Sequence, residues 1–233
     1  MTAPLPVSTW AFVAVCALAG ALAVPVGVIA SPVSTLVAGL VAFLGLRLWR
    51  WSELPGSLKT EAPAGFERVV RHAASLGLGL ILGLLLLGVI RLVIEPIVPA
   101  AGARIAAAAA LPIWRRVVII FVAAVSEELV FRLVLLSVVT GLTMRLLRHA
   151  GRRPGRGVAW GAIGLSAFAF AAVHLPAWSA VGPLSLGLVL MVLTLNGLGG
   201  VVFGYVFVTR GIVAAIWAHA GADCAIQLIG PLT

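Results

Sequence analysis

The chain has 233 residues, of which 62% are hydrophobic and only 10% are charged, and its mean hydropathy is +1.19. A soluble domain of this length does not need so much apolar surface, whereas long apolar runs are typical of membrane spans. The 16 Lys and Arg residues exceed the 7 Asp and Glu residues. Most of them lie between the apolar runs and form no patch with interleaved aromatic residues, so we expect no nucleic-acid partner.

Apolar runs of about 20 residues predict an all-α, polytopic bundle of about seven transmembrane helices. Prolines stand at several boundaries, where they begin or end helices. Because no basic segment precedes the first run, we expect a retained span rather than a cleaved signal peptide. Residues 102–114 favour a short interfacial helix. The expected spans are 10–30, 33–49, 73–94, 113–143, 157–175, 182–208 and 211–230.

The basic residues predict the orientation of the bundle. The connections 47–71 and 145–156 and the turn at Arg210 carry eleven Lys and Arg residues. The connections on the opposite side carry four: Arg91, Arg104, Arg115 and Arg116. Since Lys and Arg are enriched in cytoplasmic loops, we expect the N-terminus inside and, after an odd number of spans, the C-terminus outside.

Six ionisable residues are expected at membrane depth, where such groups face the bundle interior and mark functional sites. Glu128 and Arg132 are four residues apart on one helical face and can neutralise each other. Glu127 is rotated by about 100° from Glu128 and has no partner in its own helix. It is therefore the carboxylate available for chemistry. The alternative, that the cluster only locks helix packing, stays open.

Two other spans contribute histidines to this set. Phe170 and His174 lie one turn apart, as do His219 and Asp223, and Gly221 would allow close helix approach. Each pair alone could be a satisfied structural contact, but three helices together favour a shared site. At 1.5 Å per residue, Glu127 and His174 lie about 24 Å from the cytoplasmic ends of their helices and His219 about 12 Å. A shared site therefore requires the last helix to tilt or to begin earlier.

Several other chemistries have little support. The chain has no HExxH motif, and Asp223 is its only aspartate, which excludes an intramembrane protease with two aspartates. Ser166 and His174 share one helix two turns apart, a poor arrangement for a serine nucleophile and its base. A set of one glutamate and two histidines could bind a metal ion, and that alternative stays open.

These residues resemble the motifs of the CPBP family, which includes the CAAX prenyl proteases and bacterial Abi-type membrane proteins. "EELVFR" is similar to EExxxR, "FAAVH" to FxxxH and "HAGAD" to HxxxN/D, in the same order. The segment "GLGGVVFGYVFVTRGIVAAIWAHAGAD" also looks like the family's segment before its last motif. The resemblance covers about residues 120 to 223.

The resemblance implies an intramembrane glutamic endopeptidase that cleaves a peptide bond of a membrane-associated protein or peptide, with no cofactor and no metal. It implies an active-site cavity within a catalytic core, 112–233, that follows N-terminal helices and a connecting loop, 1–111. The expected location is a bacterial cytoplasmic membrane. By carry-over, Glu127 and His174 would activate water, and His219 and Asp223 would stabilise the oxyanion. The supporting residues would be Glu128, Arg132 and Phe170.

Asp223 departs from the asparagine that is common in the family. An ionised aspartate has only acceptors, so Asp223 would have to be protonated or would instead orient His219. Two other classes stay open: a non-catalytic immunity or scaffold protein that binds a peptide in the same cavity, and a transporter that uses these groups as a proton relay. The residues predict neither the substrate sequence nor the oligomeric state.

Overall fold

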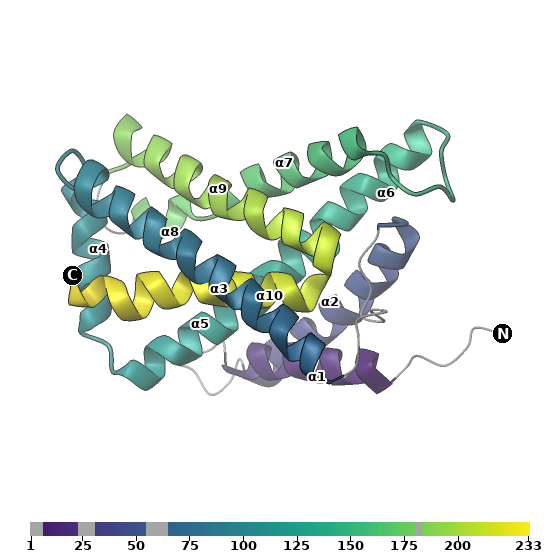
Figure 1. Ribbon diagram of the computed structural model, residues 1–233, viewed down its shortest axis with the longest axis horizontal. Helices are drawn as coiled ribbons and strands as arrows, with labels where there is room; N and C mark the ends of the chain where they lie inside the picture. The colour runs from purple at the N-terminus through teal and green to yellow at the C-terminus, as the bar shows by residue number, and fades with distance from the viewer. Residues whose placement is uncertain (1–6, 23–30, 55–64, 180–182) are drawn as a thin grey trace.

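The computed structural model describes residues 7–22, 31–54, 65–179 and 183–233, which form a bundle of helices without a strand (Figure 1). The expected all-α class is confirmed. The α-helices are α1 (Val7–Leu22), α2 (Ser31–Trp51), α3 (Phe66–Val89), α4 (Pro99–Ala109), α5 (Ile113–Glu128), α6 (Ser137–Leu146), α7 (Arg156–Ala172), α8 (Leu175–Ser179), α9 (Leu186–Arg210) and α10 (Ile212–Cys224). π-Helical segments continue α3 over Ile90–Ile94, α5 over Leu129–Leu136 and α10 over Ala225–Ile229.

Five helical stretches of the described residues are long and apolar enough to cross a membrane: Pro32–Trp51, Phe66–Ile94, Arg156–Ser179, Leu186–Arg210 and Ile212–Leu232. α1 has 16 residues, fewer than the about 20 that span a bilayer core. α5 carries four charged side chains. The polytopic class is therefore supported, while the number of seven spans stays a prediction. Residues 23–30 of the first expected span and 55–64 of the polar connection, with Lys59, lie outside the described residues.

The expected span 113–143 is one helical run, but it is not regular. α5 passes into the π-helical segment Leu129–Leu136 directly after Glu128, and α6 continues the run to Leu146. The wider π turns change the rotational positions of the residues that follow, and such segments are frequent at functional sites. The short helix expected over 102–114 is present as α4, which begins earlier, with Pro99 in its first turn.

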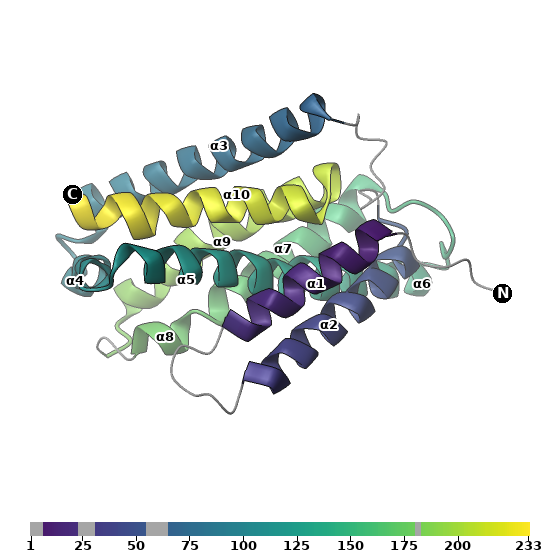
Figure 2. The same cartoon turned by 90° about the horizontal axis from the view of Figure 1, so that it is seen from below.

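α10 occupies the centre of the bundle, between α3 and α5 and against α9 (Figure 2). Its contact with α3 depends on glycines in both helices. A Cβ atom on Gly221 would collide with the carbonyl oxygen of Leu76, and one on Gly79 with that of Ala218. The two backbones are therefore in direct contact, as expected for Gly221, and this packing sets the axial position of α10.

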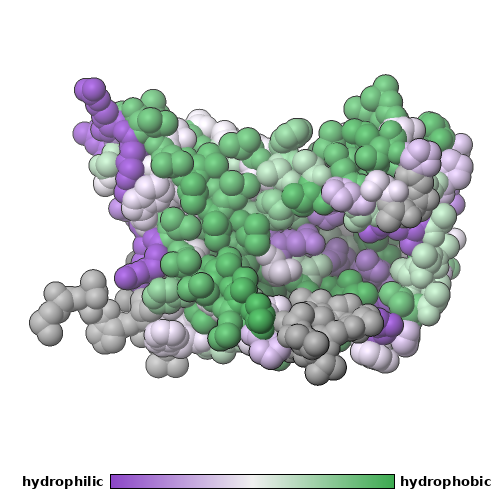
Figure 3. Space-filling model, turned by 180° about the vertical axis from the view of Figure 1, so that it is seen from behind, coloured by the Kyte–Doolittle hydropathy of each residue, from purple (hydrophilic) through white to green (hydrophobic). Residues whose placement is uncertain are grey.

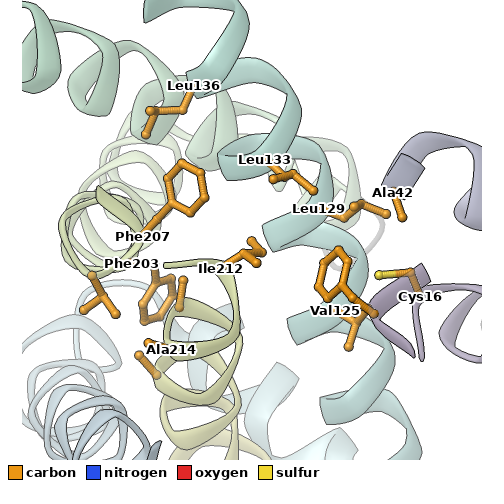
Figure 4. Packing of buried hydrophobic residues seen from close by; sticks show 14 of the residues in the cluster. Cys16, Ala42, Val125, Leu129, Leu133, Leu136, Phe203, Phe207, Ile212 and Ala214 are labelled. Atoms are coloured by element: carbon orange, nitrogen blue, oxygen red, sulfur yellow. The ribbon is translucent and has the colours of Figure 1, made fainter. Parts of the chain in front are cut away.

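A buried apolar cluster fixes the other neighbours of the π-helical segment (Figure 4). Leu129 and Leu133 from this segment pack with Cys16 of α1 and Ala42 of α2 on one side and with Phe203 of α9 on the other. The outer faces of the bundle are apolar as well, with side chains such as Leu92 81% exposed. Such faces suit a hydrocarbon solvent rather than water.

Candidate active site

Three helices bring their ionisable side chains to one place. The Oε2 atom of Glu127, at the end of α5, lies 3.8 Å from Nε2 of His174 and 3.7 Å from Nε2 of His219. His219 therefore shares the site with Glu127, although counting residues along the helices had left its depth in disagreement. Counting residues from the helix end assumed parallel helices with aligned ends, whereas packing against α3 places α10 so that His219 reaches Glu127.

His174, just after the end of α7, has a defined tautomer. Its Nδ1 lies 2.7 Å from the carbonyl oxygen of Phe170, which can only accept a hydrogen bond, so Nδ1 carries the proton. In the neutral ring, Nε2 then presents a lone pair toward the Glu127 carboxylate. Both groups are partly accessible, with 24% of the His174 side chain and 29% of the Glu127 side chain exposed. Two hydrogen-bond acceptors thus face each other at the cavity wall.

His219 is held from the opposite side of its ring. Its Nδ1 donates to Oε1 of Glu128 at 2.9 Å, within the buried interior. The ring stacks on Phe203, with centroids 4.7 Å apart and planes 14° from parallel, and Phe170 contacts it edge-on at 5.7 Å. These contacts fix the ring plane and direct Nε2 toward Glu127.

The pair expected from the sequence, Glu128 and Arg132, is present and has no exposed side-chain surface. Nε of Arg132 lies 3.2 Å from Oε2 of Glu128. Arg132 also donates from Nη2 to the carbonyl oxygen of Gly200 at 3.2 Å, and its guanidinium lies over the ring of Phe170 at 4.5 Å. Glu128 therefore serves two partners, Arg132 through one oxygen and His219 through the other. Its bond to His219 was not predicted, because sequence spacing shows only partners within one helix.

Asp223 lies one helical turn beyond His219, and its Oδ2 is 3.7 Å from the Nε2 atom of that histidine. This separation is too long for a hydrogen bond. Glu128, rather than Asp223, is the carboxylate that holds the His219 ring through a hydrogen bond. The Asp223 side chain is 24% exposed and lines the same cavity as Glu127.

These side chains surround a cavity of about 460 Å³. Its walls are mainly apolar, and α3, α5, α7, α8, α9 and α10 all contribute to them. On the face opposite to that of Figure 1, the surface is hollowed between apolar regions, and hydrophilic side chains lie in the hollow (Figure 3). Besides the predicted residues, three polar residues that the sequence did not single out for the site line the cavity: Arg104 of α4, Asn196 of α9 and Gln227 just beyond the end of α10.

Phe203 lies in the segment 197–223 that resembles the family, but nothing in that segment distinguished it from its apolar neighbours. Asn196 was missed because only ionisable residues were considered at membrane depth. Phe170, in contrast, was predicted and contacts His174, His219 and Arg132. Glu127, His174 and His219 are of the types that bind metals. Over residues 7–22, 31–54, 65–179 and 183–233, however, no three His, Cys, Asp or Glu side chains are arranged to hold a metal ion.

Comparison with known proteins identifies the family. Residues 108–225 match the family model described as "Type II CAAX prenyl endopeptidase Rce1-like", which covers just over half of the chain. The matched region contains all seven residues predicted for the site. Neither the curated proteins nor the solved structures contain a match to the chain.

Proposed function

Because the chain belongs to the Rce1-like type II CAAX prenyl endopeptidase family, we propose that it hydrolyses a peptide bond of a membrane protein or peptide, with Glu127 as the general base. The observation that carries the proposal is the separation of 3.8 Å between Oε2 of Glu127 and Nε2 of His174. Two acceptors cannot bond to each other, but one water molecule can donate a hydrogen to each. That water would be oriented with its lone pairs toward the cavity.

The proposed reaction needs no group beyond these side chains and water. As the water oxygen attacks the carbonyl carbon of the substrate, the Glu127 carboxylate takes its proton and the carbonyl oxygen becomes an oxyanion. Glu127 then passes the proton to the amide nitrogen, the C–N bond breaks, and the products are an amine and a carboxylic acid. General base catalysis by a positioned side chain contributes about 10²–10⁴-fold.

His219 is the proposed donor to the oxyanion. Its Nδ1 proton is already given to Glu128, so the ring must be an imidazolium to donate from Nε2 as well. The carboxylates of Glu127, Glu128 and Asp223 lie within 4 Å of the ring nitrogens, at 3.7, 2.9 and 3.7 Å, and can balance that charge. One donor of this kind contributes about 10²–10³-fold to the rate. Asp223 would then act by its charge and by contact with the substrate, not by holding the ring.

The test compares parent and Glu127→Gln chains by the new N-termini that each generates in the membrane proteome of a host cell, and then on one cleaved peptide in lipid vesicles. We expect Glu127→Gln to lose about 10²–10⁴-fold in rate, since an amide cannot take the proton. Its stability should change little, because Glu127 is partly exposed and has no ion pair with Arg132, and because Glu128 keeps its hydrogen bond to His219.

The matched control is Glu67→Gln, the same chemical change in the exposed first turn of α3. It should cleave like the parent. A well-folded Glu127→Gln chain that keeps a tenth or more of the parental rate would contradict the assignment of Glu127 as the base.

A further inference from the structure

The cavity extends from the candidate active site toward one end of the bundle only. On α10 its lining begins at His219 and continues to Gln227 beyond the helix end, and along α7 and α8 it continues from Phe170 to Trp178. α5 and α9 run in the opposite direction, and there the lining extends back toward their beginnings, to Ile119 and Met191. All four stretches therefore lead to the same end, where α4 and α8 lie (Figure 1).

That end is poor in free basic residues. It carries four arginines, Arg91, Arg104, Arg115 and Arg116. Three of these make contacts that stabilise the fold: Arg91 binds Glu95 and the carbonyl oxygen of Gly230, Arg116 the carbonyl oxygen of Gln227, and Arg104 that of Ala177. These arginines hold the C-terminal segment and α8 in place.

The opposite end is rich in arginine. The end of α2, the start of α3, the segment from α6 to α7 and the end of α9 all lie there (Figure 1). The arginines in the connection between α6 and α7 are all exposed. Basic residues in short connections favour the cytoplasmic side. The described arginines at this end are Arg47, Arg50, Arg68, Arg71, Arg145, Arg148, Arg152, Arg153, Arg156 and Arg210.

From these two asymmetries together we propose that the cavity opens on the non-cytoplasmic side of the membrane, and that the substrate peptide reaches Glu127 from that side. That a substrate uses this opening rests on the proposed function, whereas the direction of the opening does not depend on it. The substrate class is thus a membrane protein or peptide whose scissile bond lies at or beyond the outer half of the bilayer. Apolar residues should flank that bond, because side chains such as Leu86, Ile90 and Leu195 line the route.

The experiment uses the full chain with its two cysteines replaced, Cys16→Ala and Cys224→Ala, and single new cysteines as reporters. Ala177→Cys places a thiol in the cavity wall at the proposed mouth, where the residue is exposed. Arg153→Cys reports the arginine-rich end, and Thr233→Cys reports the same end as Ala177 but outside the cavity wall. Intact cells are treated with a membrane-impermeant maleimide, before and after permeabilisation.

We expect Ala177→Cys and Thr233→Cys to react in intact cells and Arg153→Cys only after permeabilisation. A bulky maleimide on Ala177→Cys should also abolish cleavage, while the same label on Thr233→Cys should not. Labelling of Arg153→Cys in intact cells, or of Ala177→Cys only after permeabilisation, would overturn the direction of the opening. Continued cleavage by fully labelled Ala177→Cys would overturn the route. The labelling measurement does not require the chain to cleave anything. A chain that cleaves nothing would therefore refute the proposed function, while the labelling would still decide the direction of the opening.

Discussion

Replacing Arg132 with methionine leaves the Glu128 carboxylate buried without its ion-pair partner. Both side chains have no exposed surface, and the pair is joined at 3.2 Å. Removing one partner of such a pair costs about 3–5 kcal/mol, because the remaining charge is desolvated without compensation. The substitution also removes the hydrogen bond to Gly200 and the contact with the Phe170 ring. Methionine fills much of the same volume, so the loss of charge dominates.

The assay is thermal unfolding of the purified chain in detergent. If the relation for soluble domains of 150–250 residues holds, about 2–4 °C per kcal/mol, the expected fall in Tm is about 6–20 °C. The control is the double variant Arg132→Met/Glu128→Gln, in which no charge remains buried at the pair. Its glutamine oxygen can still accept the hydrogen bond from Nδ1 of His219. We therefore expect the double variant to melt above the Arg132→Met single variant.

Two results would refute this reasoning. An unchanged Tm for Arg132→Met would mean that Glu128 does not depend on its partner for stability. A double variant that falls by the sum of the two single variants would mean that the two charges are not coupled, and that each side chain stabilises the bundle separately.

Three further predictions concern packing, the aspartate and metal. Gly79→Ala should lower the Tm, because its methyl group meets the Ala218 carbonyl at a cost of about 1–3 kcal/mol. Gly77→Ala on the same helix should leave the Tm unchanged, since a Cβ atom there meets nothing within 4 Å. An equal loss for both variants would argue against close packing with α10. Asp223→Asn should keep much of the cleavage rate, because the amide can still contact the substrate and Glu127 and Glu128 still balance the charge of His219, whereas Asp223→Ala removes that contact as well and should lose most of the rate. Parental rates for Asp223→Ala would place that residue outside the site. Cleavage should persist in phenanthroline if the water is activated by a carboxylate and a histidine alone, and activity lost to the chelator and restored by zinc would reverse that prediction.

Local spacing was sufficient to identify the parts of this site that lie within one helix. The ion pair of Glu128 and Arg132 follows from their four-residue separation, which holds in the structure although a π-helical segment begins between them. The apolar runs predicted the helical class and most helix positions, because a bilayer requires about 20 apolar residues for each span. The motif resemblance pointed to the family that residues 108–225 match.

Only the tertiary structure decided how residues on different helices meet. Counting at 1.5 Å per residue left a mismatch of about 12 Å between the depth of His219 and that of Glu127, and the sequence could not remove it because tilt and axial position depend on packing between helices. Glycines at positions 79 and 221 allow α10 to lie directly against α3, where His219 reaches Glu127 at 3.7 Å and Glu128 at 2.9 Å. A single sequence records which side chains a helix carries, but the contact that gives Glu128 a second partner depends on the relative positions of two helices, which interhelical packing determines.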